Sequence, residues 1–199
     1  MSDHTQKLAA LVGSRICHDL ISPVGAIQNG VELLAMEGRA SPELSLIEES
    51  VKNASARIRF MRIAFGSTTQ DQPVSRHEIE QTLENMGHAG RVRYAWAVND
   101  ACTRGEAQQI FLAILCLESA MPRGGTIVVN HDATGWAVTG PAELDRIDPD
   151  LWESLRGQDA KQAQPAHVQF PLLASILAAQ NAVAQVFNSQ NGITICTNR

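Results

Sequence analysis

The sequence lacks the features that mark nucleic-acid-binding, membrane and secreted proteins. Its 199 residues carry a formal net charge of −5 with no lysine or arginine block, which argues against a general nucleic-acid partner. No secretory hydrophobic segment opens the chain, and no apolar run approaches the roughly 20 residues that span a bilayer. The four cysteines lie far apart, without metal-site spacing, and are expected to be reduced thiols. We therefore expect a cytoplasmic protein with no membrane span, no nucleic-acid partner and no metal site.

One stretch, from Arg15 to Gly30, is unusual. It places His18 beside Asp19 in an apolar-periodic segment, with Pro23 five residues after the histidine. At about 100° per residue, its apolar positions form one stripe of a helix predicted over residues 5–36. The stripe consists of Ala9, Val12, Ile16, Leu20, Val24, Ile27, Val31 and Leu34. His18 falls roughly opposite this stripe, so the sequence predicts an imidazole that is presented outward.

The position of His18 does not by itself assign a function. A lone histidine on a helix is commonly a solvated or capping residue. Pro23, however, removes the hydrogen bond to the carbonyl of Asp19 and costs roughly 3 kcal/mol in a helix interior. A defect of this kind close to a presented histidine suggests that local helix geometry matters to what the histidine does, although it names no reaction.

A second helix is predicted from Ser41-Pro42, a capping pair, to Gly66, and the short connection makes the two helices antiparallel neighbours. Its apolar residues alternate steps of three and four, which is typical of a coiled-coil seam. They are Leu44, Ile47, Val51, Ala54, Ile58, Met61 and Phe65, and further apolar positions at Leu33, Leu46, Phe60 and Ile63 also need cover. We predict that two hairpins pair in a homodimeric four-helix bundle. The alternative is that the stripes pack against the second half of the same chain.

The second half predicts an α/β two-layer sandwich, which makes the fold class α+β. A polar linker over residues 67–72 separates a hairpin domain, 1–68, from this second domain, 73–199. Capping boxes at Ser75 and Thr103 head two helices, and further helices are expected over 149–155 and 170–180. Strands are expected over 91–98, 126–130, 135–139, 183–187 and 193–196, where side chains alternate or turns flank apolar runs.

The segment HDLISPV resembles the histidine box of two-component signalling proteins, H-(E/D)-x-x-(S/T/N)-P-(L/V), on the first helix of a dimerisation and phosphotransfer hairpin. In this resemblance His18 matches the phosphoacceptor, Asp19 the adjacent acid, Ser22 the polar position and Pro23 the kink. In its length and its second half, the whole chain resembles the ChpT-type histidine phosphotransferases of alphaproteobacteria, which are histidine-kinase-like with a degenerate ATP-binding domain.

The second half resembles a kinase ATP-binding domain in the order of its elements but lacks three of that domain's features. Cys116 stands about where the family's magnesium-holding asparagine would be, no DxGxG box occurs near Gly135 or Gly140, and no GxG follows. Without close-approach glycines and their backbone donors, a triphosphate has no cradle. The resemblance therefore implies a domain that supports the bundle and contributes to docking a response regulator.

The resemblance implies a histidine phosphotransferase that relays a phosphoryl group between aspartates of receiver domains through His18, without ATP. A hybrid kinase's receiver would act upstream and response regulators downstream, and the receiver would supply Mg²⁺, since no cofactor of its own is expected. Asp19 would orient the imidazole. The expected docking surface consists of Ser14, Arg15, Ile21, Ser22 and Gly25. Two alternatives stay open, an ATP-dependent kinase fragment and a non-catalytic docking adaptor; phosphatase action on a receiver is a variant of the main hypothesis.

Overall fold

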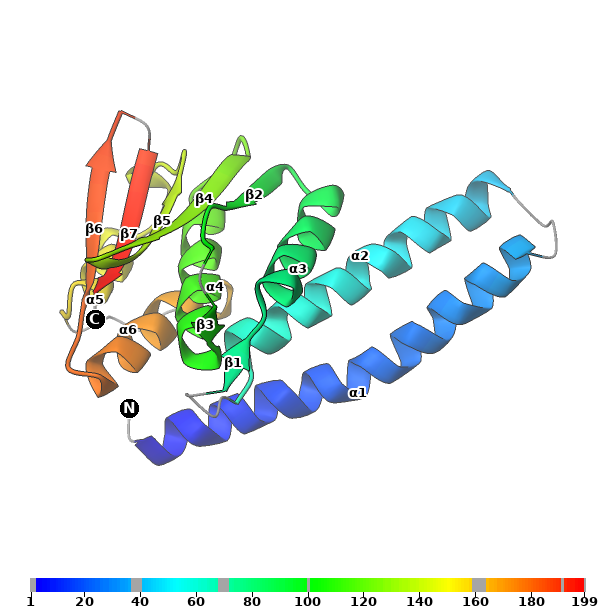
Figure 1. Ribbon diagram of the computed structural model, residues 1–199, viewed down its shortest axis with the longest axis horizontal. Helices are drawn as coiled ribbons and strands as arrows, with labels where there is room; N and C mark the ends of the chain where they lie inside the picture. Colours follow the sequence, from blue (N-terminus) through cyan, green and yellow to red (C-terminus); the bar gives the residue numbers. More distant parts are fainter. Residues whose placement is uncertain are drawn as a thin grey trace.

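The computed structural model describes residues 3–36, 41–67, 72–99, 101–158, 164–190 and 192–198. Two long helices, α1 (Asp3–Met36) and α2 (Pro42–Phe65), form a hairpin that extends away from a mixed helix and sheet part (Figure 1). The helices of that part are α3 (Arg76–Ala89), α4 (Arg104–Ser119), α5 (Pro149–Leu155) and α6 (Gln169–Ala179), with 3₁₀ turns η1 (Leu144–Arg146) and η2 (Pro165–His167). The predicted helical first part and α/β second part are thus confirmed.

The ends of α2 follow from local sequence. Ser41 caps the helix by accepting a hydrogen bond from the Leu44 backbone N–H at 3.2 Å, and Pro42 occupies the first turn, as predicted. At the other end, a Cβ on Gly66 would lie 2.2 Å from the carbonyl oxygen of Arg62. Only glycine therefore fits this position, where α2 stops and the chain turns away. The residues that join α1 to α2, 37–40, lie outside the described ranges.

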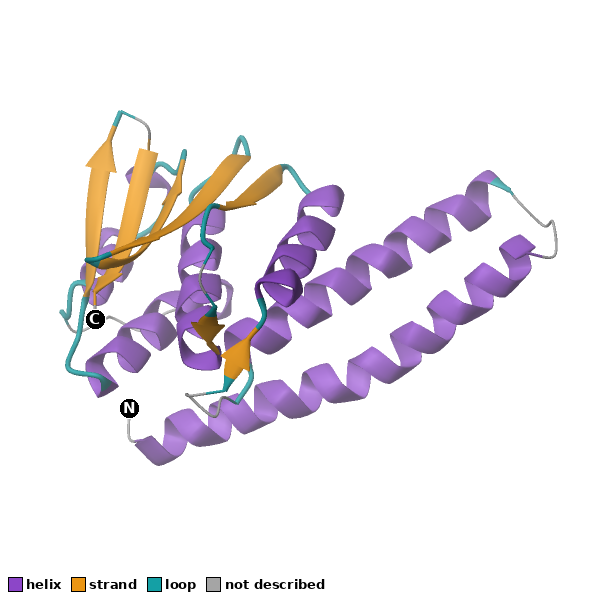
Figure 2. Cartoon of the chain, in the orientation of Figure 1, coloured by secondary structure: helices purple, strands orange, loops and turns teal. Residues whose placement is uncertain are grey.

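The main sheet has five strands in the order β2-β4-β5-β7-β6 (Figure 2). β2 (Val92–Trp96) pairs parallel with β4 (Gly125–Asp132), whereas β5 (Gly135–Gly140), β6 (Ala184–Ser189) and β7 (Gly192–Asn198) are joined by antiparallel pairings. All five strands were predicted. On β4, Ile127 and Val129 are buried while Val128 between them is half-exposed, so helices cover one face of the sheet and the other is open.

A second, two-stranded sheet was not predicted. β1 (Pro73–Val74) pairs antiparallel with β3 (Cys102–Thr103). Strands of two residues show no alternation of apolar and polar side chains, so the sequence offers no signal for them. Their pairing holds the start of α3 close to the start of α4.

Helix α4 lies at the centre of the molecule. Its predicted capping box is complete, because Thr103 Oγ1 accepts from the Glu106 N–H and a Glu106 carboxylate oxygen accepts from the Thr103 N–H. From Ala107 to Ile114 every residue of α4 is buried. A helix that is apolar on all sides must be covered on all sides; here the sheet covers one side and α2 another.

The C-terminal half of α2 belongs to the same core. Phe60 is wholly buried, its ring centre 4.6 Å from that of Phe111 on α4, and Ile63 and Ala64 are buried beside it. The expectation that a partner hairpin covers Phe60 and Ile63 was therefore wrong: the chain's own second half covers them. The sequence pattern shows that these residues need cover but not which surface supplies it.

A buried amide ties α2 to α4 as well. Gln108 Nε2 donates to the carbonyl oxygens of Ala64 at 3.2 Å and Gly66 at 3.0 Å. Carbonyls at a helix C-terminus have no partner within the helix, so Gln108 satisfies two groups that burial would otherwise leave unpaired.

Most of the described residues in the predicted apolar stripe of α1 are left exposed by the described part of the chain. Ile16, Leu20 and Ile27 are 55%, 46% and 52% exposed, whereas Cys17 and Val31 are buried. The side of α1 that faces α2 thus runs through Cys17 and Val31, so Val31 at one edge of the stripe is covered, whereas Ile16, Leu20 and Ile27 are not.

Candidate functional site

His18 lies in the first half of α1, and its side chain is 83% exposed. It directly follows Cys17, which is buried, so the ring points about 100° around the helix from that buried position. The outward presentation expected from the sequence is present. An imidazole in this position is accessible to a second molecule and can react with it.

Asp19 contacts two neighbours at once. Its Oδ1 lies 3.1 Å from His18 Nδ1, and its Oδ2 accepts a hydrogen bond from Arg15 Nε at 2.7 Å. The hydrogen bond with His18, and next the one from Arg15, hold the pKa of the Asp19 carboxyl below its usual value. Three residues on one exposed turn of helix therefore form a connected polar group.

The lowered pKa of Asp19 predicts a pH dependence. Because the contacts favour the ionised form of Asp19 in the folded chain, they stabilise the fold at pH values above the ordinary aspartate pKa. This stabilisation is lost as the pH falls through the lowered pKa of Asp19 in the folded chain. We expect a ¹³C NMR titration of the Asp19 carboxyl to show a midpoint below that of an ordinary aspartate. The midpoint should move back up in His18→Ala and in Arg15→Ala. An ordinary midpoint in the wild type would mean that the contacts do not persist in solution.

Pro23 lies inside α1 without ending it, since the helix is continuous from Asp3 to Met36. In a regular helix the N–H of residue 23 would donate to the carbonyl of Asp19, but proline has no N–H, so this hydrogen bond is missing. Pro23 thus removes one regular helix hydrogen bond just after His18.

The other predicted docking residues differ in their surroundings. Ile21 and Ser22 are exposed, and Gly25 is half-exposed with open space where a Cβ would be. Ser14 is half-buried, and its Oγ accepts a hydrogen bond from the Ser67 N–H at 2.7 Å. Ser14 therefore joins α1 to the end of α2, while Ile21, Ser22 and Gly25 remain available beside His18.

Two residues near His18 were missed by the sequence analysis. A Cβ on Gly13 would lie 2.8 Å from the Phe65 carbonyl oxygen, so this glycine allows α1 and α2 to approach closely. Burial raises the pKa of the Cys17 thiol, and the positive charge of Arg62 on α2 opposes that rise. Because Gly13 lies against Phe65 and Ser14 bonds to Ser67, Arg62 stands at about the level of Cys17 along the antiparallel pair. The arginine-rich run of residues 57–62 was the available signal.

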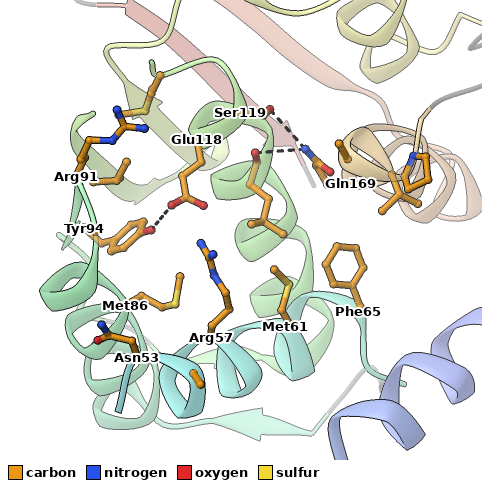
Figure 3. Close-up of a pocket in the computed structure, with 18 residues that line it drawn as sticks. Asn53, Arg57, Met61, Phe65, Met86, Arg91, Tyr94, Glu118, Ser119 and Gln169 are labelled. Carbon is orange, nitrogen blue, oxygen red and sulfur yellow. Dashed lines mark hydrogen bonds between the residues drawn. The ribbon is translucent and has the colours of Figure 1, made fainter. Parts of the chain in front are cut away.

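A cavity of about 830 Å³ lies elsewhere, between α2, α3, β2, the end of α4 and the start of α6 (Figure 3). Tyr94 Oη donates to Glu118 Oε1 at 2.6 Å within it, and Arg57 extends toward this pair. No residue of α1 is among those that line the cavity in the described part of the chain. His18 is therefore outside this cavity, on an exposed face of α1.

The described residues contain no group of three or more histidines, cysteines or acids that could hold a metal ion. Cys116, the residue at the expected asparagine position, is wholly buried in α4, and burial raises the pKa of its thiol. Among the described helices, none combines the length and hydropathy needed to cross a bilayer.

Comparisons with known proteins point to a single family. Residues 76–191 match the family model of the histidine phosphotransferase C-terminal domain. The chain is 30% identical over 179 residues to the protein phosphotransferase ChpT of Brucella abortus (strain 2308), covering 87% of this chain and 86% of that protein. A solved structure of a bacterial phosphotransferase superposes with a TM-score of 0.68 at 25% identity, over 100% of this chain and 98% of the other.

The family match covers more than half of the chain, and the similarity to the Brucella protein extends over most of both sequences. Together they establish the class of the protein and its type of reaction. The chain belongs to the histidine phosphotransferase family and is a phosphotransferase of phosphorelay signalling.

Proposed function

We propose that the protein carries a phosphoryl group between aspartates of receiver domains on His18, without using ATP. The observation that carries this proposal is the contact of His18 Nδ1 with Asp19 on an exposed helix face. Residues 1–68 would perform the transfer, and residues 73–199 would support the hairpin and contribute to docking. The relay would operate in the cytoplasm, with a hybrid kinase's receiver upstream and response regulators downstream.

The geometry suggests how the imidazole reacts. When Nδ1 carries the proton, it donates to Asp19 Oδ1, and the lone pair is then on Nε2. In the forward step Nε2 attacks the phosphorus of an aspartyl phosphate, an N–P bond forms, and the P–O bond to the receiver's aspartate breaks to leave a carboxylate. The ring becomes cationic, and ionised Asp19 stabilises it. The reverse step passes the group to a second aspartate.

The receiver would supply the magnesium ion, which neutralises charge on the phosphoryl oxygens during transfer. The chain's own contribution is to position and orient the imidazole. Arg15 is tied to Asp19 and so holds the acid in place. Ile21, Ser22 and Gly25 would meet the receiver beside the ring.

The proposed absence of ATP chemistry rests on the second half of the chain. Gly140 lies in β5 and packs toward Ile127 and Met121, and Gly192 starts β7 against the backbone of Gly140. These glycines serve close packing within the sheet, so they are not free to form a loop whose N–H groups surround phosphates.

We also propose that the protein is a homodimer through a four-helix bundle. Three residues of the α1 stripe, Ile16, Leu20 and Ile27, are about half exposed in the single chain, and exposed apolar residues that line up along a long helix are typical of an interface. His18 lies on the other side of α1 from the stripe. Pairing through the stripe would therefore leave both histidines of the dimer accessible.

A charge in the stripe should separate the dimer. We expect Ile27→Glu to sediment as a single chain of 21.6 kDa, whereas the wild type sediments as two, because a carboxylate buried between helices has no partner. Leu11→Glu is the matched control: Leu11 is 58% exposed on the same helix but lies outside the stripe. A wild type that is monomeric at micromolar concentration would contradict the proposal.

The relay itself is tested by comparing phosphoryl donors. Purified full-length chain is incubated either with labelled ATP alone or with a receiver domain already labelled on its aspartate. The proposal expects label on the chain from the receiver and none from ATP. Label from ATP would instead indicate a kinase, and no label from several receivers would favour the docking adaptor.

A further inference from the structure

Most arginines of the described chain have a partner. Ion pairs or hydrogen bonds involve Arg15, Arg76, Arg91, Arg104, Arg123, Arg146 and Arg156. Arg59 and Arg62 of α2 are exposed and make no hydrogen bond or ion pair with any residue that the structure describes. Their charges are therefore available to a second molecule.

Arg62 lies next to the phosphoacceptor's turn. Its charge acts on the thiol of Cys17, the residue before His18. The pairing of the helices agrees with this position: Gly13 lies against Phe65 and Ser14 against Ser67, so in an antiparallel pair Cys17 lies at the level of Arg62.

Arg59 lies on the same side of the hairpin as His18. His18 directly follows Cys17, which is buried. Arg59 directly follows Ile58, which is half-buried and lies one heptad before Phe65, the residue that Gly13 of α1 contacts, so we place Ile58 on the seam with α1. In two antiparallel right-handed helices, a step of one residue from the shared seam rotates both side chains toward the same side of the pair. The next position along, Phe60, is buried in the core, so Arg59 lies at the edge of the exposed strip.

The proposed partner has the opposite charge. An aspartyl phosphate is anionic, and a receiver that holds Mg²⁺ must present carboxylate ligands around it. Cations beside the attacking nitrogen attract such a surface and raise the rate of encounter. Arg15 would have to give up its ion pair with Asp19 in order to bind, whereas Arg59 and Arg62 have no ion pair among the residues that the structure describes.

We infer that Arg59 and Arg62 form a basic rim on α2 that docks the acidic surface around a receiver's phosphorylated aspartate. The inference rests on the proposed function and specifies which surface selects the partner. The rim acts on binding and orientation, while His18 performs the transfer.

The test measures transfer from a phosphorylated receiver domain to full-length chain as a function of receiver concentration. Arg59→Glu and Arg62→Glu should each lower kcat/KM by about tenfold, as expected for loss of electrostatic steering. The change should appear in KM, with kcat at saturating receiver unchanged. Arg62→Lys should keep near wild-type kcat/KM, and the dependence of the rate on ionic strength should become weaker in both glutamate variants.

Arg93→Glu is the matched control, because Arg93 is also exposed and unpaired within the described residues but lies on the edge strand β2. Thermal unfolding of each variant checks that the fold is kept. The inference is overturned if the α2 variants transfer as Arg93→Glu does, or if kcat falls while KM stays constant. Failure of the proposed function looks different, because the wild type itself would then accept no label.

Discussion

Replacing His18 with alanine or glutamine is expected to abolish phosphoryl transfer from a phosphorylated receiver. Neither side chain has a nucleophilic nitrogen with a free lone pair, and no other histidine shares the exposed turn of α1 with Asp19 and Arg15. Loss of a nucleophile commonly lowers kcat by about 10³-fold or more. The measurement is single-turnover transfer of labelled phosphate, followed on a gel.

His77→Gln provides the matched control, since His77 is an exposed histidine in the first turn of α3, outside the site. It should transfer at the wild-type rate. Full transfer by His18→Gln would show that the phosphoryl group resides elsewhere, and preserved partner signalling by His18→Ala would support the adaptor alternative.

The largest effect on stability is expected at Phe60. Its side chain has no exposed surface, and its ring centre lies 4.6 Å from that of Phe111 and 6.4 Å from that of Tyr94. Phe60→Ala removes these contacts and leaves a cavity between α2 and α4, which typically lowers the free energy of unfolding by about 3–5 kcal/mol. Denaturant unfolding of the full chain measures the loss.

Phe187→Ala is the control for this prediction, because Phe187 is 53% exposed on the edge strand β6. A surface substitution of this kind should change stability by no more than about 0.5 kcal/mol. Equal effects at Phe60 and Phe187 would show that α2 does not share the core of the sheet-containing part in solution.

The parts of the fold that were predictable rest on local signals. Ser41-Pro42 at the start of α2 and Thr103 with Glu106 at the start of α4 are capping patterns whose hydrogen bonds involve residues three apart. They can therefore be read from the sequence without knowing what surrounds the helix.

The parts that were missed depend on contacts between distant segments. Phe60 is covered by α4, and Gln108 reaches the end of α2 across more than 40 positions of sequence. The apolar pattern identified Phe60 as a residue that needs cover, but either a partner chain or the chain's own second half satisfies that pattern equally well.

In the candidate site, too, the local contacts could be predicted and the long-range contacts could not. His18 and Asp19 are adjacent in sequence, so their contact follows from the local motif. Ser14, in contrast, bonds to Ser67, and Arg62 lies beside Cys17 only because α1 and α2 pair in one particular register. A single sequence specifies which residues are small or basic but not this register.

The most direct measurement is ³¹P NMR of the full-length chain after incubation with a phosphorylated receiver domain. The proposed relay predicts a single phosphoramidate resonance that is stable in base, lost in acid and absent from His18→Gln. A resonance from an acyl phosphate or a phosphate ester, or a phosphoramidate that persists in His18→Gln, would contradict it.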